Sequence, residues 1–166
     1  ANACVLHYVE NSRECKDGDM LLMDFGAEYA NYAADLSRTI PVNGKFSARQ
    51  KEVYNACLSV HHEANNLMNP GLTLNEYNAE VKKVIQSALI YISLIDKNAD
   101  QKDKDALTIK YFPHGTSHYL GLDVHDIGNR YAKMEEGMCF TIEPGIYIRE
   151  EGIGVRIEND FVKKYD

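Results

Sequence analysis

Apolar and polar residues alternate in two regions of this chain, one near each end. The alternation runs through about residues 20–40 and, in pieces, through 138–143, 145–149 and 153–163. Glycine, asparagine or charged residues interrupt each region near its middle. Apolar residues at every second position, interrupted in this way, are typical of two strands joined by a turn. The pattern therefore predicts one β-hairpin near each end of the chain, and shorter strands around Cys4–Tyr8 and 108–112.

Between the two hairpins, apolar residues recur at the spacing of amphipathic helices. Ser47 with Gln50, and Thr73 with Glu76, each match a capping box at the start of such a segment. The first helix is expected to end near the Asn-Pro-Gly sequence at 69–71, which is a strong stop signal. The segment 96–106 is dominated by charged and polar residues and is predicted to be a solvated loop. The apolar positions of the two helices are Val53, Ala56, Cys57, Val60, Ala64 and Leu67, then Tyr77, Val81, Val84, Ile85, Ala88, Leu89 and Ile92.

Two antiparallel hairpins and two helices favour an α+β fold over a doubly wound parallel sheet. With 166 residues, 45% of them hydrophobic, the chain can bury a core and fits one domain.

The net charge is −7 without a basic cluster, so nucleic acid is not an expected partner. No apolar run approaches the roughly 20 residues that span a bilayer, so no membrane association is expected. Cys4, Cys15, Cys57 and Cys139 form no CxxC pattern and are interpreted as reduced thiols of a cytoplasmic protein, with a disulfide left open.

Each predicted hairpin carries two carboxylates. Asp24 and Asp35 lie eleven positions apart, and Glu143 and Glu158 lie fifteen apart. Residues equidistant from a hairpin turn face each other, so turns centred between residues 29 and 30 and between 150 and 151 would bring each pair together. Neighbouring carboxylates repel unless a proton or a cation lies between them. With His118 between the hairpins in sequence, four carboxylates and one imidazole suit a pair of divalent ions: manganese, zinc, cobalt or iron.

Six segments around these residues carry a family resemblance. They are LHYVEN at 6–11, MDFGAEY at 23–29, YAADLSRT at 32–39, HGTSHYLGLDVHD at 114–126, TIEPGIYI at 141–148 and GVRIEND at 154–160. In this order and spacing the chain resembles the pita-bread metallopeptidases, most closely aminopeptidase P and next prolidase. The resemblance implies a curved antiparallel sheet with flanking helices. It also implies that residues 1–166 form most of the catalytic domain, and that an amino-terminal domain and the start of the catalytic domain are missing.

The resemblance also implies a ligand set. Asp24, Asp35, His118, Glu143 and Glu158 would hold two divalent ions, commonly manganese in this subfamily. Asp35 and Glu158 would bridge both ions, Asp24 would bind one of them, and His118 and Glu143 would bind the other.

The expected reaction releases the first residue of peptides with proline in second position, through a hydroxide that bridges the metals and attacks the scissile carbonyl. Glu143 would accept the proton of the water and pass it to the leaving proline nitrogen. His114 and His125 would stabilise the oxyanion or bind near the proline, and His7 and Arg156 would contact the substrate. Tyr147 fits the proline pocket and the core equally well, whereas His61 and His62 are interpreted as packing or surface residues.

Three alternatives remain open at this stage. Prolidase would cleave only Xaa-Pro dipeptides, by the same chemistry. A non-catalytic pita-bread binding module or a metal-free creatine hydrolase would be expected to lack part of the ligand set. The full-length protein is expected to be a homo-oligomer.

Overall fold

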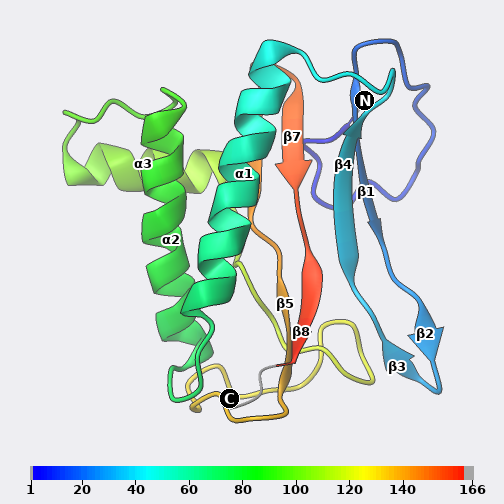
Figure 1. Cartoon of the computed structure of the whole chain (residues 1–166), viewed down its shortest axis with the longest axis vertical. Coiled ribbons are helices and arrows are strands. Elements are labelled where there is room, and N and C mark those ends of the chain that lie inside the picture. The colour runs from blue at the N-terminus through cyan, green and yellow to red at the C-terminus, as the bar shows by residue number, and fades with distance from the viewer. Residues whose placement is uncertain (1, 163–166) are drawn as a thin grey trace.

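Two long antiparallel hairpins and three helices make up the molecule, as described for residues 2–162 by a computed structural model. The carboxyl-terminal hairpin lies between the helices and the amino-terminal hairpin (Figure 1). The elements are β1 (Met20–Phe25), β2 (Glu28–Tyr29), β3 (Tyr32–Ala33), β4 (Leu36–Pro41), α1 (Ala48–Leu67), α2 (Leu74–Tyr91), α3 (Gln101–Tyr111), β5 (Cys139–Ile142), β6 (Gly145–Ile148), β7 (Ile153–Arg156) and β8 (Asn159–Val162).

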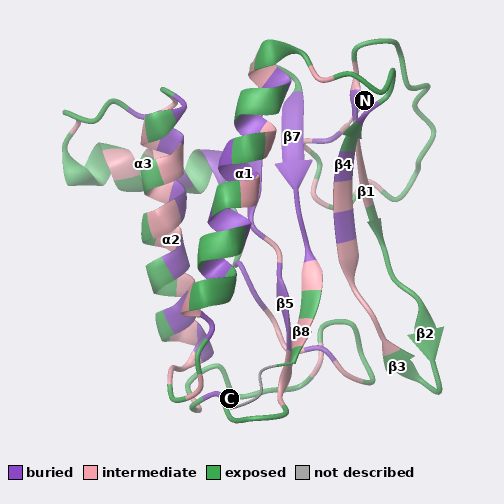
Figure 2. Cartoon of the chain, viewed as in Figure 1, coloured by how far each residue is buried: buried purple, intermediate pink, exposed green. Residues whose placement is uncertain are grey.

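Helices α1 and α2 begin at the predicted capping boxes. Ser47 and Thr73 each accept a hydrogen bond from the backbone N–H three residues on, and Gln50 and Glu76 each accept one in return. The buried residues of both helices join those of the central strands in one hydrophobic core, with α1 packed on α2 and on β5, β6 and β7. Figure 2 shows buried positions on the helices and on the central strands. Among residues 2–162, no helix is both long enough and apolar enough to cross a bilayer.

The third helix corrects two predictions, the loop at 96–106 and the strand at 108–112. Residues Gln101–Tyr111 form α3, which starts where the Asp100 side chain accepts a hydrogen bond from the backbone N–H of Asp103. Gln86 of α2 donates to the side chains of Asp105 and Thr108, so polar contacts hold α3 against α2. The predicted loop is confirmed at 96–100 and wrong from residue 101, because a helix held by polar contacts shows little apolar periodicity in its sequence.

The predicted strand at Cys4–Tyr8 is also wrong, because this segment forms turns that pack on β7. Gly154 makes the approach possible, since a Cβ on it would lie 2.2 Å from the carbonyl oxygen of Ala3. The Cys4 thiol donates to the carbonyl of Ile153 at 3.4 Å. All four cysteines carry free thiols.

In the first hairpin, the predicted turn centre between residues 29 and 30 is displaced by one residue. Asp24 lies opposite Ser37, not Asp35, because the turn is centred on Ala30 and Asn31, both with positive φ (51° and 69°). The ladder is interrupted beside Asp35, where a Cβ on Gly26 would lie only 1.7 Å from the Ala34 carbonyl oxygen. This close approach requires glycine, and Asp35 lies in the short stretch between β3 and β4 that belongs to neither strand.

In the second hairpin, the predicted centre between residues 150 and 151 is confirmed. Gly145 pairs with Arg156, and Ile142 pairs with Asn159, so one register runs through β6–β7 and β5–β8. Glu143 and Glu158 are therefore opposite each other, at the break between the two ladders. The predicted strand 153–163 is divided by this break, and its residue 163 lies outside the described residues.

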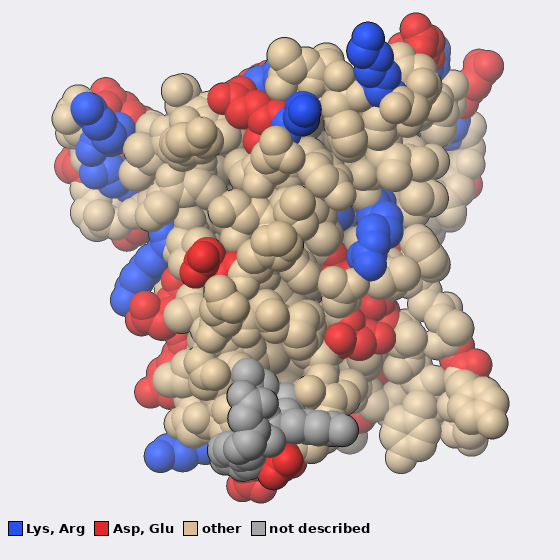
Figure 3. Space-filling view, viewed as in Figure 1, with Lys and Arg blue, Asp and Glu red and all other residues tan. Residues whose placement is uncertain are grey.

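Charged side chains of both signs are distributed over the surface. On the face shown in Figure 3, lysine and arginine lie among aspartate and glutamate along the helices and at the hairpin ends. Two ion pairs join helices to the turn between β6 and β7. Arg49 of α1 pairs with Glu151 at 2.8 Å, and Lys110 of α3 pairs with Glu150.

Candidate metal centre

Glu158 occupies the most buried position of the candidate centre. Its side chain is 2% exposed, and its Oε2 accepts a hydrogen bond from the Ser37 hydroxyl at 2.6 Å. Its backbone N–H donates to the Ser37 carbonyl at 3.2 Å. The other carboxylate oxygen, Oε1, is buried and finds no hydrogen-bond partner within residues 2–162. A buried carboxylate oxygen without a donor is costly unless a proton or a cation satisfies it.

Two sets of donor atoms meet at Glu158. His118, Glu143 and Glu158 form one set, and Asp24, Asp35 and Glu158 form the other. In each set the possible ligand atoms lie within 4.8 Å of one another. The structure therefore brings all five predicted ligands together, in an arrangement that fits two adjacent cations sharing Glu158. Oxygen-rich donor sets with one imidazole suit divalent transition metals.

His118 is oriented with one ring nitrogen toward the carboxylates. Its Nδ1 donates to the carbonyl of Tyr119 at 2.9 Å, because a carbonyl can only accept. The lone pair of Nε2 is then available, 3.5 Å from Asp35 and 3.7 Å from Glu143. The backbone N–H of His118 donates to the Thr141 hydroxyl, which ties this loop to β5. Although burial opposes it, the Asp35 carboxylate raises the pKa of this ring when no cation is bound. In its neutral form, an imidazole anchored in this way can bind a metal ion through Nε2.

When no cation is bound, both glutamates have raised pKa values, so Glu143 is mostly protonated and Glu158 partly protonated at neutral pH. Burial, followed by the charge of Glu158, raises the pKa of Glu143 to about 8. Burial also raises the pKa of Glu158 to about 7, and Asp35 adds to the shift. A bound cation would stabilise the charged carboxylates and so lower both pKa values, which means that protons and metal compete for these oxygens.

This competition predicts how stability depends on pH. A carboxyl with a raised pKa favours folding below its unfolded pKa of about 4.5, and this contribution is lost as pH rises through the folded value. The melting temperature of the metal-free protein will therefore fall between about pH 5 and pH 8. The increase produced by Mn²⁺ will be larger at pH 8 than at pH 6. Differential scanning calorimetry with EDTA or with Mn²⁺ measures both trends.

Glu143→Gln is the control for this experiment, because an amide does not titrate. It should flatten the metal-free profile near pH 8. A metal-free melting temperature that stays level from pH 5 to pH 8 in the unsubstituted protein would contradict the explanation.

Arg156 lies between the carboxylates, with its side chain only 5% exposed. Its Nη2 donates to Asp24 at 2.5 Å, its Nε to the Ser37 hydroxyl at 2.8 Å and its Nη1 to the Tyr147 hydroxyl at 3.2 Å. These contacts satisfy most of the guanidinium within the protein, and they favour a role in balancing the negative charge. The predicted contact of Arg156 with substrate stays a prediction.

His114 is connected to the same network through Tyr147. Its Nδ1 donates to the carbonyl of Gly115 at 2.7 Å, so Nε2 accepts from the Tyr147 hydroxyl at 2.8 Å. Its Nδ1 lies 3.7 Å from Glu143. Tyr147 therefore belongs to the site, although its place in alternating strand sequence fitted the core equally well. Ser37 was not predicted as part of the site. The sequence signal that could have indicated it is its position two residues after Asp35, which places both on the same face of an extended chain.

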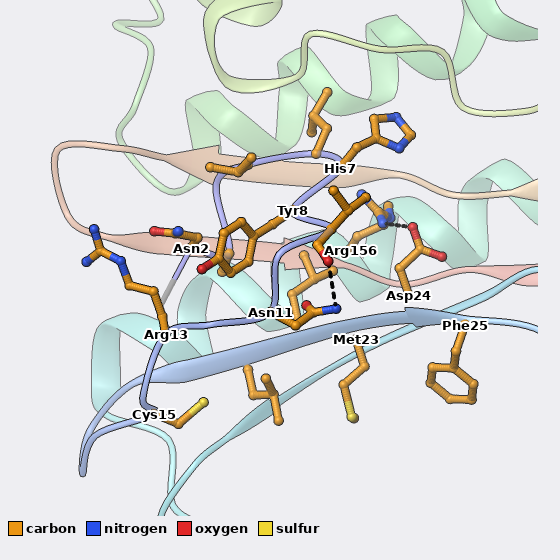
Figure 4. Close-up of a pocket in the computed structure, with 16 residues that line it drawn as sticks. Asn2, His7, Tyr8, Asn11, Arg13, Cys15, Met23, Asp24, Phe25 and Arg156 are labelled. Carbon is orange, nitrogen blue, oxygen red and sulfur yellow. Dashed lines mark hydrogen bonds and ion pairs between the residues drawn. The ribbon is translucent and has the colours of Figure 1, made fainter.

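His125 and His7 are the two exposed histidines of the predicted site, in which Asp24 is also exposed. The ring of His125 lies 4.2 Å from that of His118, centroid to centroid. Both exposed histidines line an open pocket of about 340 Å³ that also reaches Asp24 and Asp35. A neighbouring pocket of about 670 Å³ lies between the amino-terminal segment and β1 (Figure 4). There Asp24 points toward Arg156, whereas Met23 and Phe25 point to the other side of the strand.

Comparison with known proteins agrees with this geometry. The model of metallopeptidase family M24 matches residues 1–164. The chain belongs to metallopeptidase family M24. Xaa-Pro aminopeptidase of *Escherichia coli* is 41% identical over 97% of the chain and 39% of its own length. Human Xaa-Pro aminopeptidase 3 is 40% identical over 97% of the chain and 34% of its own length. The M24 chain thus spans between about a third and two fifths of these relatives.

Solved structures of M24 proteins confirm the predicted pita-bread α+β fold. *E. coli* aminopeptidase P, in a complex with substrate, superimposes with a TM-score of 0.89 at 40% identity, covering 97% of this chain and 39% of that one. A zinc-substituted form of the same enzyme with product gives the same TM-score at 41% identity and the same coverage. Proline aminopeptidase P II of *Yersinia pestis* gives 0.89 at 40% identity, covering 97% and 40%.

Proposed function

We propose that this chain is most of the catalytic domain of a metal-dependent Xaa-Pro aminopeptidase. Such an enzyme removes the first residue of peptides with proline in second position. The observation that carries the proposal is the buried Glu158 carboxylate, shared by two donor sets and left with one unpaired oxygen. Relatives named Xaa-Pro aminopeptidase support the substrate class. The complete ligand set disfavours a binding module or a metal-free hydrolase.

Two divalent ions would be held by Asp24, Asp35, His118, Glu143 and Glu158. When bound, they would supply Lewis acidity and lower the pKa of a water molecule at the site. We propose Mn²⁺ as the native ion, because the donors are four carboxylates and one imidazole.

The residues around the ions have separate roles in this proposal. The Glu143 carboxylate would take up a proton at one oxygen and deliver it to the proline nitrogen, which must be protonated before it leaves. His114 would bind near the scissile carbonyl, in an orientation that Tyr147 fixes through its hydroxyl. His125 and His7 would contact the substrate from the open pocket. Homo-oligomeric assembly and a cytoplasmic location stay predictions from the sequence.

Peptide length separates this function from prolidase. The full-length protein, loaded with Mn²⁺, should release the first residue of Xaa-Pro-Xaa peptides with a higher kcat/KM than it shows for Xaa-Pro dipeptides. Chromatographic quantification of the released amino acid measures both. A clear preference for dipeptides would favour prolidase instead. Asp35→Ala is the control for metal dependence, and its residual rate should equal that of the EDTA-treated protein.

A further inference from the structure

A series of hydrogen bonds connects helix α1 with the backbone of Glu158. His61, on the buried face of α1, is 6% exposed, and its Nε2 lies 3.2 Å from the Nδ2 of Asn159. The Oδ1 of Asn159 accepts from the Nη2 of Arg38 at 2.7 Å. The Nη1 of Arg38 donates to the carbonyl of Glu158 at 2.6 Å. Three side chains from α1, β8 and β4 thus converge on the peptide of a proposed metal ligand.

The donors and acceptors in this series can be arranged in only one way. A guanidinium only donates, so the oxygen of the Asn159 amide must face Arg38 and its NH₂ group must face His61. The Nε2 of His61 must therefore accept, which requires a neutral ring with its proton on Nδ1. Burial agrees with this assignment, because it lowers the pKa of His61 to about 4.

Arg38 links the two hairpins at the point where the site is built. Its Nη1 also donates to the carbonyl of Ser37 at 2.8 Å, and the same carbonyl accepts the backbone N–H of Glu158. The Ser37 hydroxyl holds the Glu158 carboxylate itself. Both polar groups of the Glu158 backbone and one carboxylate oxygen are thus fixed, so the unpaired oxygen has a defined direction.

We propose that His61 is a positioning residue for Glu158: as a hydrogen-bond acceptor it holds Asn159, which orients Arg38 against the Glu158 carbonyl. The inference rests on the proposed function and identifies a determinant of metal affinity outside the ligand set. A packing role would require only the volume of the ring, which lies near Phe161 with centroids 6.3 Å apart. A positioning role requires an acceptor atom at the place of Nε2.

Mn²⁺ titrations followed by electron paramagnetic resonance separate the two roles. His61→Leu fills the volume without an acceptor, and we expect it to weaken binding of the more weakly held ion about tenfold, in the range for residues that orient ligands. His61→Gln places an amide oxygen near the position of Nε2 and should recover most of that loss. His62→Leu, at the exposed neighbouring position, should bind Mn²⁺ like the unsubstituted protein.

Wild-type affinity in His61→Leu would overturn the inference, and so would an equal loss in His61→Gln. If His61→Leu does not fold, Asn159→Ala is the deciding variant. A tenfold loss of its Mn²⁺ affinity supports the inference, and an unchanged Mn²⁺ affinity overturns it.

If the unsubstituted protein binds no Mn²⁺, the proposed function fails. The inference is then tested separately by hydrogen exchange of the Glu158 amide in the metal-free protein. Exchange at least about tenfold faster in His61→Leu or Asn159→Ala supports it, and an unchanged rate overturns it.

Discussion

Replacing Glu158 by glutamine will lower kcat/KM of the Mn²⁺-loaded full-length protein on an Xaa-Pro-Xaa peptide by about a thousandfold, equivalent to about 4 kcal/mol. Glutamine keeps the size of the side chain and can still accept from the Ser37 hydroxyl. It removes the negative charge at the one position common to both donor sets. We therefore expect the number of tightly bound Mn²⁺ ions to fall, which equilibrium dialysis with elemental analysis will measure together with the rates.

Glu63→Gln is the matched control, since it makes the same chemical change at an exposed position of α1. It should retain both the metal content and the rate of the unsubstituted protein. Two tightly bound ions and a normal rate in Glu158→Gln would show that Glu158 is not a shared ligand.

Replacing Arg156 by leucine will destabilise the metal-free protein by about 1–3 kcal/mol, the cost of leaving buried hydrogen-bond partners unsatisfied. The lost ion pair adds little, because the Asp24 side chain is 43% exposed and water solvates its charge. The substitution leaves Asp24 without its cation and the hydroxyls of Ser37 and Tyr147 without a donor. For a chain of this size the melting temperature should fall by about 2–12 °C. The loss should be smaller with Mn²⁺ bound, because the ions replace part of the missing positive charge.

Thermal denaturation with and without Mn²⁺ tests this expectation. Arg156→Lys should recover only part of the stability, because an ammonium group cannot reach all three partners in the way the planar guanidinium does. Arg13→Leu, at an exposed position on the rim of the larger pocket, should change the melting temperature little. Equal melting temperatures for Arg156→Leu and the unsubstituted protein would contradict the charge-balancing role.

Local signals were sufficient for two of the helices and insufficient for the third. The starts of α1 and α2 depend on side chains three residues apart, and such pairs are visible in the sequence. Helix α3 depends on its packing against Gln86 of α2, and only the folded structure shows that contact. The Asp100 cap, three residues before Asp103, was the available signal.

The candidate site could be predicted in its residues but only in part in its geometry. The second hairpin follows the simple register, so Glu143 and Glu158 oppose each other as expected. The first does not, because positive φ at Ala30 and Asn31 shifts the turn by one residue. Contacts between the hairpins then bring Asp24 and Asp35 to Glu158. Ser37 was not predicted, and neither was the contact of His61 with Asn159, since these partners lie far apart in sequence. For Tyr147 the sequence left the pocket and the core equally open.

The packing of the amino-terminal segment on Gly154 has a consequence for the order in which the molecule assembles. The segment that carries His7 has no helix or strand of its own, and it contacts a strand from the opposite end of the chain. Contacts at such separation are made late, because the entropy of closing the intervening loop must be overcome first. The wall of the pocket beside Asp24 will therefore be completed only after β7 has formed, at the same late stage as the contacts that bring Asp24 and Asp35 to Glu158.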